Sequence, residues 1–126
     1  MAELIDGKAL AAQVREGLRA RIAHLTQKGF RPGLAVVRVG DDPASQVYVR
    51  NKVKACESIG LFSEQCELPE DASEAEVLET VRALNRRQDI HGILVQLPLP
   101  AHINSRVIID AIDPGKDVDG FHPCNL

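Results

Sequence analysis

Aromatic side chains are scarce in this chain of 126 residues, which contains no tryptophan, one tyrosine and three phenylalanines. The core must therefore be built mainly from Val, Ile, Leu and Ala. No apolar run approaches the roughly 20 residues of a membrane span. The first residues have neither the basic start nor the apolar core of a signal peptide. We therefore expect a soluble, cytoplasmic protein, and the length suits one domain.

An excess of one charge is also missing. The formal net charge is −3, and acidic and basic residues are interspersed along the chain. Proteins that bind nucleic acid or anionic membranes usually carry a clustered basic patch. We therefore expect neither a nucleic acid nor a membrane as partner.

Cysteine and histidine are too few and too scattered for a disulfide framework or a metal centre. The cysteines are Cys56, Cys66 and Cys124, and the histidines are His24, His91, His102 and His122. The cysteines are odd in number and form no CxxC pair, and the histidines have no partner at ligand spacing. The sequence therefore predicts reduced thiols and no bound metal.

A glycine-rich nucleotide-binding turn is missing as well. Gly29, Gly33 and Gly40 do not form a GxGxxG motif, and Gly115 and Gly120 lie in the turn-rich tail. That motif follows a strand and opens a helix where a dinucleotide binds. We therefore expect no dinucleotide site of this kind within these residues.

The chain does contain a regular alternation of strand and helix patterns. Helices are expected at 8–28, 43–60, 73–87 and 104–112, and strands at 34–39, 61–66 and 92–96, with a short strand or arm at 3–5. Such an alternation is typical of a parallel sheet with right-handed crossovers. We predict an α/β fold, a three-layer α/β/α sandwich with a mainly parallel sheet, formed by residues 1–126 as one domain.

The segment 43–60 places a lysine at the edge of the core. Its predicted core stripe consists of Val49, Val53 and Cys56. Tyr48 and Lys52, four residues apart, stack on one face beside that stripe, and Ser45 shares this face. The alternative is that Lys52 runs its methylenes along Tyr48 and reaches water, as amphipathic side chains commonly do.

Gln96 closes the third long strand, and the prolines that follow cannot continue a central ladder. In such sheets ligands gather outside the carboxyl ends of the strands. The segment 43–60 starts from this same edge, and Lys52 lies about 14 Å along its axis. A site that uses Lys52 must therefore be a cleft along the flank of the domain.

Four segments together carry a family resemblance: IDGK at 5–8, SQVYVRNK at 45–52, GILVQLPLP at 92–100 and KDVDGF at 116–121. In this order and spacing the chain resembles the catalytic N-terminal domain of the bifunctional methylenetetrahydrofolate dehydrogenase/methenyltetrahydrofolate cyclohydrolase (FolD) family. The resemblance covers essentially the whole chain. For the full-length enzyme it implies oxidation of 5,10-methylenetetrahydrofolate with NADP, or less often NAD, and hydrolysis of the product to 10-formyltetrahydrofolate.

The resemblance also implies roles for individual residues. Tyr48 would stack on the folate, Lys52 would be the catalytic lysine, Gln96 would position that lysine, Asp119 would bind the pterin, and Ser45 and Pro98 would be further substrate contacts. A carboxylate can accept the ring N–H and the exocyclic amine of a pterin in a fork. Two plainer interpretations stay open: Asp119 as a turn residue beside Gly120, and Tyr48 as an ordinary packing residue.

The implied chemistry needs a group that moves protons, because water must attack a cation and a ring N–C bond must then break. Lys52 could act as base or acid if desolvation beside Val49 favours its neutral form. Gln96 could accept a hydrogen bond from Lys52 through its carbonyl oxygen. Ser45 could add a second one.

The resemblance implies that NADP is bound mainly by a C-terminal domain that is absent from these residues. We therefore expect that the chain alone lacks dehydrogenase activity. The full-length enzyme is expected to be a homodimer, and this piece to be a monomer. Tetrahydrofolate derivatives are the implied partners.

Two other functions share features with this sequence. Tyr48 and Lys52 also match the YxxxK pair of the short-chain dehydrogenases, but those enzymes need a nucleotide loop upstream, and only about forty residues precede this tyrosine. The remaining alternative is a non-catalytic, flavodoxin-like binding or regulatory module whose polar residues are structural.

Overall fold

The computed structural model describes residues 7–125. Its strands are β1 (Gly33–Val39), β2 (Phe62–Leu68) and β3 (Gly92–Val95), and its helices are α1 (Gly7–Gln27), α2 (Pro43–Ser58), α3 (Glu74–Arg86) and α4 (Ser105–Ala111). The strands form a parallel sheet in the order β2-β1-β3. Two short 3-10 turns, Pro114–Lys116 and Pro123–Asn125, follow α4. The expected strand or arm at 3–5 lies outside the described residues.

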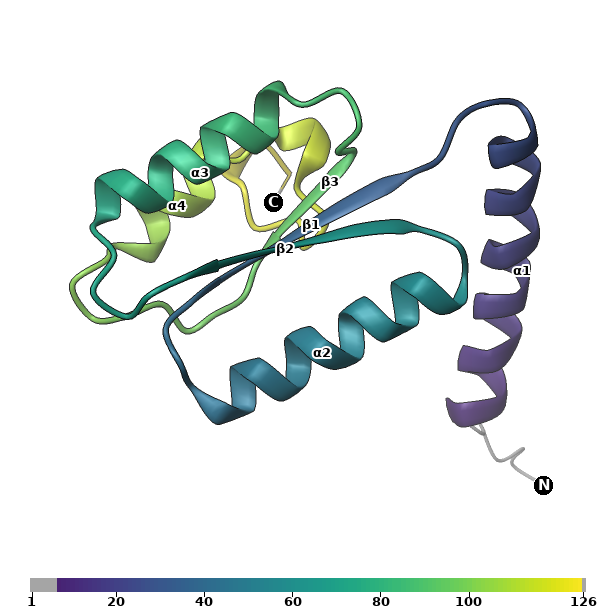
Figure 1. Ribbon diagram of the computed structural model, residues 1–126, viewed down its shortest axis with the longest axis horizontal. Coiled ribbons are helices and arrows are strands. Elements are labelled where there is room, and N and C mark those ends of the chain that lie inside the picture. The colour runs from purple at the N-terminus through teal and green to yellow at the C-terminus, as the bar shows by residue number, and fades with distance from the viewer. Residues whose placement is uncertain (1–6, 126) are drawn as a thin grey trace.

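The sheet is the middle of three layers. Figure 1 shows α2 on one face of the sheet and α3 with α4 on the other. Each crossover passes from one parallel strand through a helix to the next, as the alternating pattern requires. The predicted α/β/α sandwich with a parallel sheet is confirmed.

The strands are buried because both of their faces are covered. In β1, Ala35 and Val37 pack into the cluster under α3 and α4, whereas Val36 between them packs against α2. In β3, Ile93 and Leu94 divide in the same way. Successive side chains of a strand point to opposite faces, so a near-continuous apolar run serves both layers.

The start of α2 follows from its sequence. The Asp42 side chain accepts a hydrogen bond from the Ala44 amide at 2.9 Å, and Pro43 occupies the first helical turn, where no intrahelical donor is needed. The helix ends before Gly60, whose φ of +89° suits glycine. The predicted core stripe of this helix, Val49, Val53 and Cys56, is buried.

The first helix, α1, forms as predicted, but most of its apolar side is exposed. Of the five recurring apolar residues at 10, 14, 18, 22 and 25, only Ile22 is buried. The helix lies beside the C-terminal end of α2 (Figure 1), where Arg19 donates to the Ser58 carbonyl and Arg31 to that of Gly60. Because α2, α3 and α4 already cover the sheet, α1 packs at its margin.

Candidate active site

Lys52 and Gln96, which are 44 residues apart in the sequence, meet beside the sheet. The Lys52 Nζ donates a hydrogen bond to Gln96 Oε1 at 2.7 Å. Lys52 is half-buried on α2, at the edge of the core stripe. Gln96 directly follows β3, and its backbone amide donates to the Val37 carbonyl at 2.9 Å, which continues the ladder with β1. Two regular elements therefore hold the pair.

The side-chain amide of Gln96 has a defined orientation. Its Nε2 donates to the carbonyl of Leu97 at 3.0 Å, while its Oε1 accepts from Lys52. A flipped amide would present an N–H to the ammonium and an oxygen to a carbonyl, so both hydrogen bonds would be lost. The Lys52 ammonium therefore faces an acceptor, and its two remaining N–H donors are available to other groups.

Asp119 lies in the loop after Pro114–Lys116, on the same side of the molecule as Lys52. As a residue it is exposed, yet desolvation of the carboxylate raises the pKa of Asp119, and the nearby charge of Asp117 adds to this effect. The Lys52 ammonium acts in the opposite direction and lowers the pKa. An amine and a carboxylate, distant in sequence, are thus close enough to interact.

The loop that carries Asp119 is joined to the sheet. Asp117 forms an isolated parallel bridge with Ile93 of β3. Its carboxylate accepts hydrogen bonds from the His122 amide at 2.8 Å and from Asn125 Nδ2 at 3.3 Å. Burial alone would raise the pKa of Asp117, but these donors outweigh burial and hold the pKa below its usual range.

The other predicted site residues differ in exposure. Tyr48 is 57% exposed one helical turn before Lys52, so its ring is open to a flat ligand. Pro98 is also exposed, and its peptide bond with Leu97 is cis. Ser45 is buried, and within residues 7–125 it makes no hydrogen bond with Lys52. Tyr48 and Pro98 therefore offer surface to a ligand, whereas Ser45 offers almost none.

The turn between β1 and α2 does not fit a dinucleotide. A pyrophosphate at a helix N-terminus needs free backbone N–H groups and little negative charge. Here Pro43 has no N–H, the Ala44 amide is taken by Asp42, and Asp41 adds a second carboxylate. The turn between β2 and α3 carries acidic residues too, at 70 and 71.

The described residues offer little support for thiol chemistry or a metal centre. Cys56, Cys66 and Cys124 are free thiols, and burial raises the pKa of Cys56 and of Cys66. Within residues 7–125, no group of three or more His, Cys, Asp or Glu side chains is placed to hold a metal ion. None of the described helices combines the length and apolar character needed to cross a membrane.

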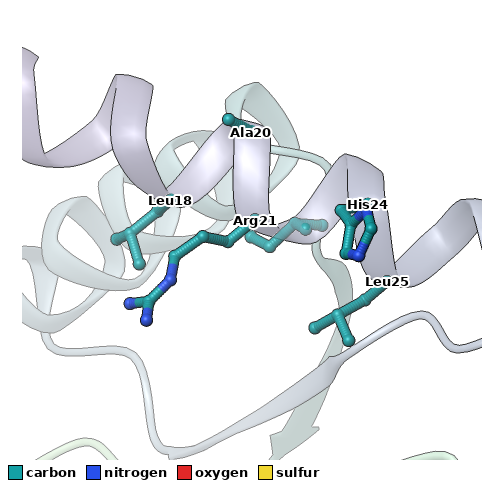
Figure 2. Close-up of a pocket in the computed structure, with 6 residues that line it drawn as sticks. Leu18, Ala20, Arg21, His24 and Leu25 are labelled. Atoms are coloured by element: carbon teal, nitrogen blue, oxygen red, sulfur yellow. The ribbon is translucent and has the colours of Figure 1, made fainter.

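A shallow hollow on α1 lies apart from the Lys52 pair. It is lined by Leu18, Ala20, Arg21, Ile22, His24 and Leu25, all from this one helix (Figure 2). None of the predicted site residues lines it.

One residue of the Asp119 loop had no role in the sequence analysis. Lys116 Nζ donates to carbonyl oxygens of Leu84, Asn85 and Arg87 at the end of α3. Its place in the KDVDGF segment was the only available signal. A sequence pattern cannot distinguish a lysine that caps another helix from one that points into water.

The comparisons with known proteins agree on one family. The family model for the tetrahydrofolate dehydrogenase/cyclohydrolase catalytic domain matches residues 5–119. The bifunctional protein FolD of Cupriavidus necator is 60% identical over 124 residues, which is 98% of this chain and 44% of that protein. The chain thus spans less than half the length of this curated relative.

Solved structures show the same likeness. The bifunctional FolD dehydrogenase/cyclohydrolase of Campylobacter jejuni superposes with a TM-score of 0.94 at 49% identity, over 95% of this chain and 43% of that one. The FolD of Trypanosoma brucei, solved with NADP and an inhibitor, gives a TM-score of 0.93 at 38% identity, over 98% of this chain and 42% of that one.

Proposed function

Because this chain belongs to the tetrahydrofolate dehydrogenase/cyclohydrolase family through its catalytic domain, we propose that it supplies the folate site and the catalytic lysine of that bifunctional enzyme. The substrates would be 5,10-methylenetetrahydrofolate, oxidised to the 5,10-methenyl form, and the methenyl form, hydrolysed to 10-formyltetrahydrofolate. This places the protein in one-carbon metabolism, and we expect it in the cytoplasm.

The observation that carries the proposal is the Lys52–Gln96 hydrogen bond of 2.7 Å beside a carboxylate whose pKa Lys52 influences. Asp119 would grip the ring N–H and exocyclic amine of the pterin in a fork. The exposed Tyr48 ring would stack on the flat heterocycle, one turn of α2 away from the amine. Pro98 would line the same side, and the buried Ser45 would contribute mainly through its backbone and packing.

The hydrolysis follows from these positions. Water attacks the cationic methenyl carbon, and Lys52 as the neutral amine takes the proton that the water loses. The N5–C bond of the adduct then breaks as its hydroxyl becomes the formyl carbonyl: the Lys52 ammonium returns its proton to N5, and the hydroxyl proton is released to bulk water, which is the one proton that the overall hydrolysis of the cation produces. Gln96 Oε1 accepts from the amine in both states, so the proton carrier keeps its place during the cycle.

NADP would be the hydride acceptor of the oxidation, as the Trypanosoma relative was solved with that cofactor. The acidic turns at the helix starts do not fit it. We therefore propose that residues 1–126 do not oxidise methylenetetrahydrofolate by themselves, and that NADP is bound mainly by residues of the C-terminal domain that FolD enzymes carry. Formation of NADPH by the pure chain would contradict this. A homodimer is expected for the full-length enzyme and a monomer for this piece, and sedimentation would test the latter.

Calorimetric titration of the chain with 5-formyltetrahydrofolate, a non-reactive folate, tests the proposal. Binding should be stoichiometric, and Asp119→Asn should weaken it about tenfold or more, since the pterin fork loses one acceptor and the charge. The matched control is Asp110→Asn, an exposed aspartate on α4. If no heat is released and Lys52→Gln leaves hydrolysis unaltered in a full-length enzyme, the flavodoxin-like binding module is favoured instead.

A further inference from the structure

The loop that carries Asp119 is anchored to the C-terminal end of α3. Lys116 precedes Asp119 by three residues and lies at the end of the short turn Pro114–Lys116. Its Nζ donates to the carbonyl oxygens of Leu84 at 3.3 Å, Asn85 at 2.8 Å and Arg87 at 2.8 Å. All three N–H donors of the ammonium therefore have protein acceptors.

These acceptors lie at the C-terminal end of α3: the Leu84 carbonyl also accepts from the amide of the cap residue Arg87 at 3.2 Å, whereas Lys116 is the side-chain donor to the carbonyls of Asn85 and Arg87. α3 ends at Arg86, so its last carbonyls have no further amide along the helix. The negative end of the helix dipole lies at the same place and favours a cation. Lys116 thus caps a helix that begins 42 residues earlier in the sequence and joins the Asp119 loop to the best-packed layer of the fold.

Further hydrogen bonds align the chain on either side of this anchor. Asn85, next to the carbonyls that hold Lys116, donates to the Ala111 carbonyl at 2.7 Å and accepts from the Asp113 amide at 2.9 Å. Beyond Lys116, the Asp117 carboxylate accepts from the His122 amide at 2.8 Å. Asp119 lies between these two attachments and is itself exposed, without a rigid element of its own.

We propose that Lys116 is a positioning residue of the folate site, whose ammonium fixes the loop that presents the Asp119 carboxylate to the pterin. The inference rests on the proposed function. The hydrogen bonds of the Lys116 ammonium go to the end of α3, whereas Lys52 is bound to Gln96. It acts through the loop, because a carboxylate displaced by about 1 Å loses the fork geometry on which affinity depends.

Lys116→Met removes the ammonium and keeps a side chain of similar length. Titration with 5-formyltetrahydrofolate should show an affinity about tenfold weaker, and hydrolysis should show KM rising more than kcat falls. Lys116→Arg, which restores a cation with several donors, should recover most of the affinity. Lys28→Met, at an exposed lysine after α1, is the matched control and should change neither quantity.

Hydrogen exchange on the ligand-free chain gives an independent measurement. In Lys116→Met, the amides of Gly120 and His122 should exchange at least several-fold faster, while those of β1 stay protected. A merely structural role would lower the stability of the whole chain and leave the affinity of the folded fraction unchanged, and that result would overturn the proposal.

The reference variant Asp119→Asn distinguishes a failure of the positioning role of Lys116 from a failure of the proposed function. If it loses affinity while Lys116→Met does not, the positioning role is wrong and the proposed function stands. If Asp119→Asn also binds normally, or the unmodified chain does not bind at all, the proposed function fails. Exchange in the loop then still decides whether Lys116 orders it.

Discussion

The two faces of the sheet are built from the same strands and serve different purposes. Among residues 7–125, thirteen buried residues form the cluster under α3 and α4, whereas four, namely Val36, Val49, Val53 and Leu94, form the cluster under α2. The half-buried amine of Lys52 lies at the margin of the smaller cluster. A thick apolar layer holds the sheet together, and the thin layer leaves room for polar groups at its edge.

The difference follows from the requirements of each layer. A carboxylate or an amine deep under α3 and α4 would lose hydration without compensation. At the edge of the α2 layer, Lys52 keeps part of its hydration and gains one amide oxygen. The rigid face thus supports the strands, and the carboxyl end of β3 holds Gln96 against Lys52 at the edge of the other face. Five predictions test this division, from the largest expected effect to the smallest.

Lys52→Gln should remove the proposed proton carrier without harming the fold. We expect methenyltetrahydrofolate hydrolysis to fall about 100- to 10,000-fold, the usual share of general acid–base catalysis. Lys54→Gln, on the exposed side of the same helix, is the control. Both variants, made in a full-length enzyme, should unfold at nearly the same temperature. Equal activity in the two variants would refute the role of Lys52.

The same truncation on the two faces should have unequal effects on stability. Val81→Ala, in the middle of the larger cluster, should lower the free energy of unfolding by about 2–3 kcal/mol. Val53→Ala, in the thin layer, should lower it by about 1–1.5 kcal/mol, since the loose surroundings can relax into the space. Urea unfolding of both variants measures the difference. Equal losses would show that the layers are packed alike.

Gln96→Glu should keep an acceptor for Lys52 and add a negative charge beside it. The carboxylate would pair with the Lys52 ammonium, so Lys52 would accept the proton of the attacking water less readily. We expect hydrolysis at neutral pH to fall about tenfold and its pH profile to move to higher pH. A lowered rate with an unshifted profile would mean that the glutamine serves only packing.

On acidification, folate binding should weaken at a higher pH than it would if Asp119 had the pKa of an ordinary aspartate. Because desolvation, helped by Asp117, raises the pKa of Asp119 against the opposing effect of Lys52, its carboxylate takes up a proton at a higher pH than usual. Affinity should therefore fall as the pH drops through that raised pKa, and Asp119→Asn should show a flatter pH dependence of binding. The reverse trend would exclude the carboxylate as the pterin acceptor.

The raised pKa of Asp119 affects the stability of the fold in the opposite direction from folate binding. A raised pKa in the folded state means that ionised Asp119 opposes folding at neutral pH and that this penalty disappears on acidification. Asp119→Asn should therefore leave the melting temperature at neutral pH unchanged or slightly raised. A clear loss of stability would mean that the carboxylate is mainly a structural turn residue.

Several features were predictable because they depend on neighbours in the sequence. The spacing of Val49, Val53 and Cys56 located the buried side of α2, and Asp42 with Pro43 located its start. Ser73, which accepts a hydrogen bond from the Glu76 amide at 3.1 Å, located the start of α3 in the same way. Short-range patterns such as these are local in origin.

The apolar spacing of α1 was a weaker guide. It predicted the helix but not its surroundings, because periodicity tells which side of a helix is apolar and not what covers that side. Leu10 and Val14 are more than half exposed, although the pattern alone would place them in a core. The roles of Ser45, Tyr48 and Pro98 remain predictions, since each role depends on contact with a ligand.

The sequence by itself determined the order of the elements, the two-sided burial of the strands and the place of Lys52 at the edge of an apolar stripe, because these follow from local periodicity and capping. Only the tertiary structure decided that Gln96 Oε1 lies 2.7 Å from Lys52 Nζ and that Lys116 caps the end of α3. Such contacts join residues separated by 29 to 44 positions. They exist only once the layers have packed, because packing and not sequence proximity brings those atoms together.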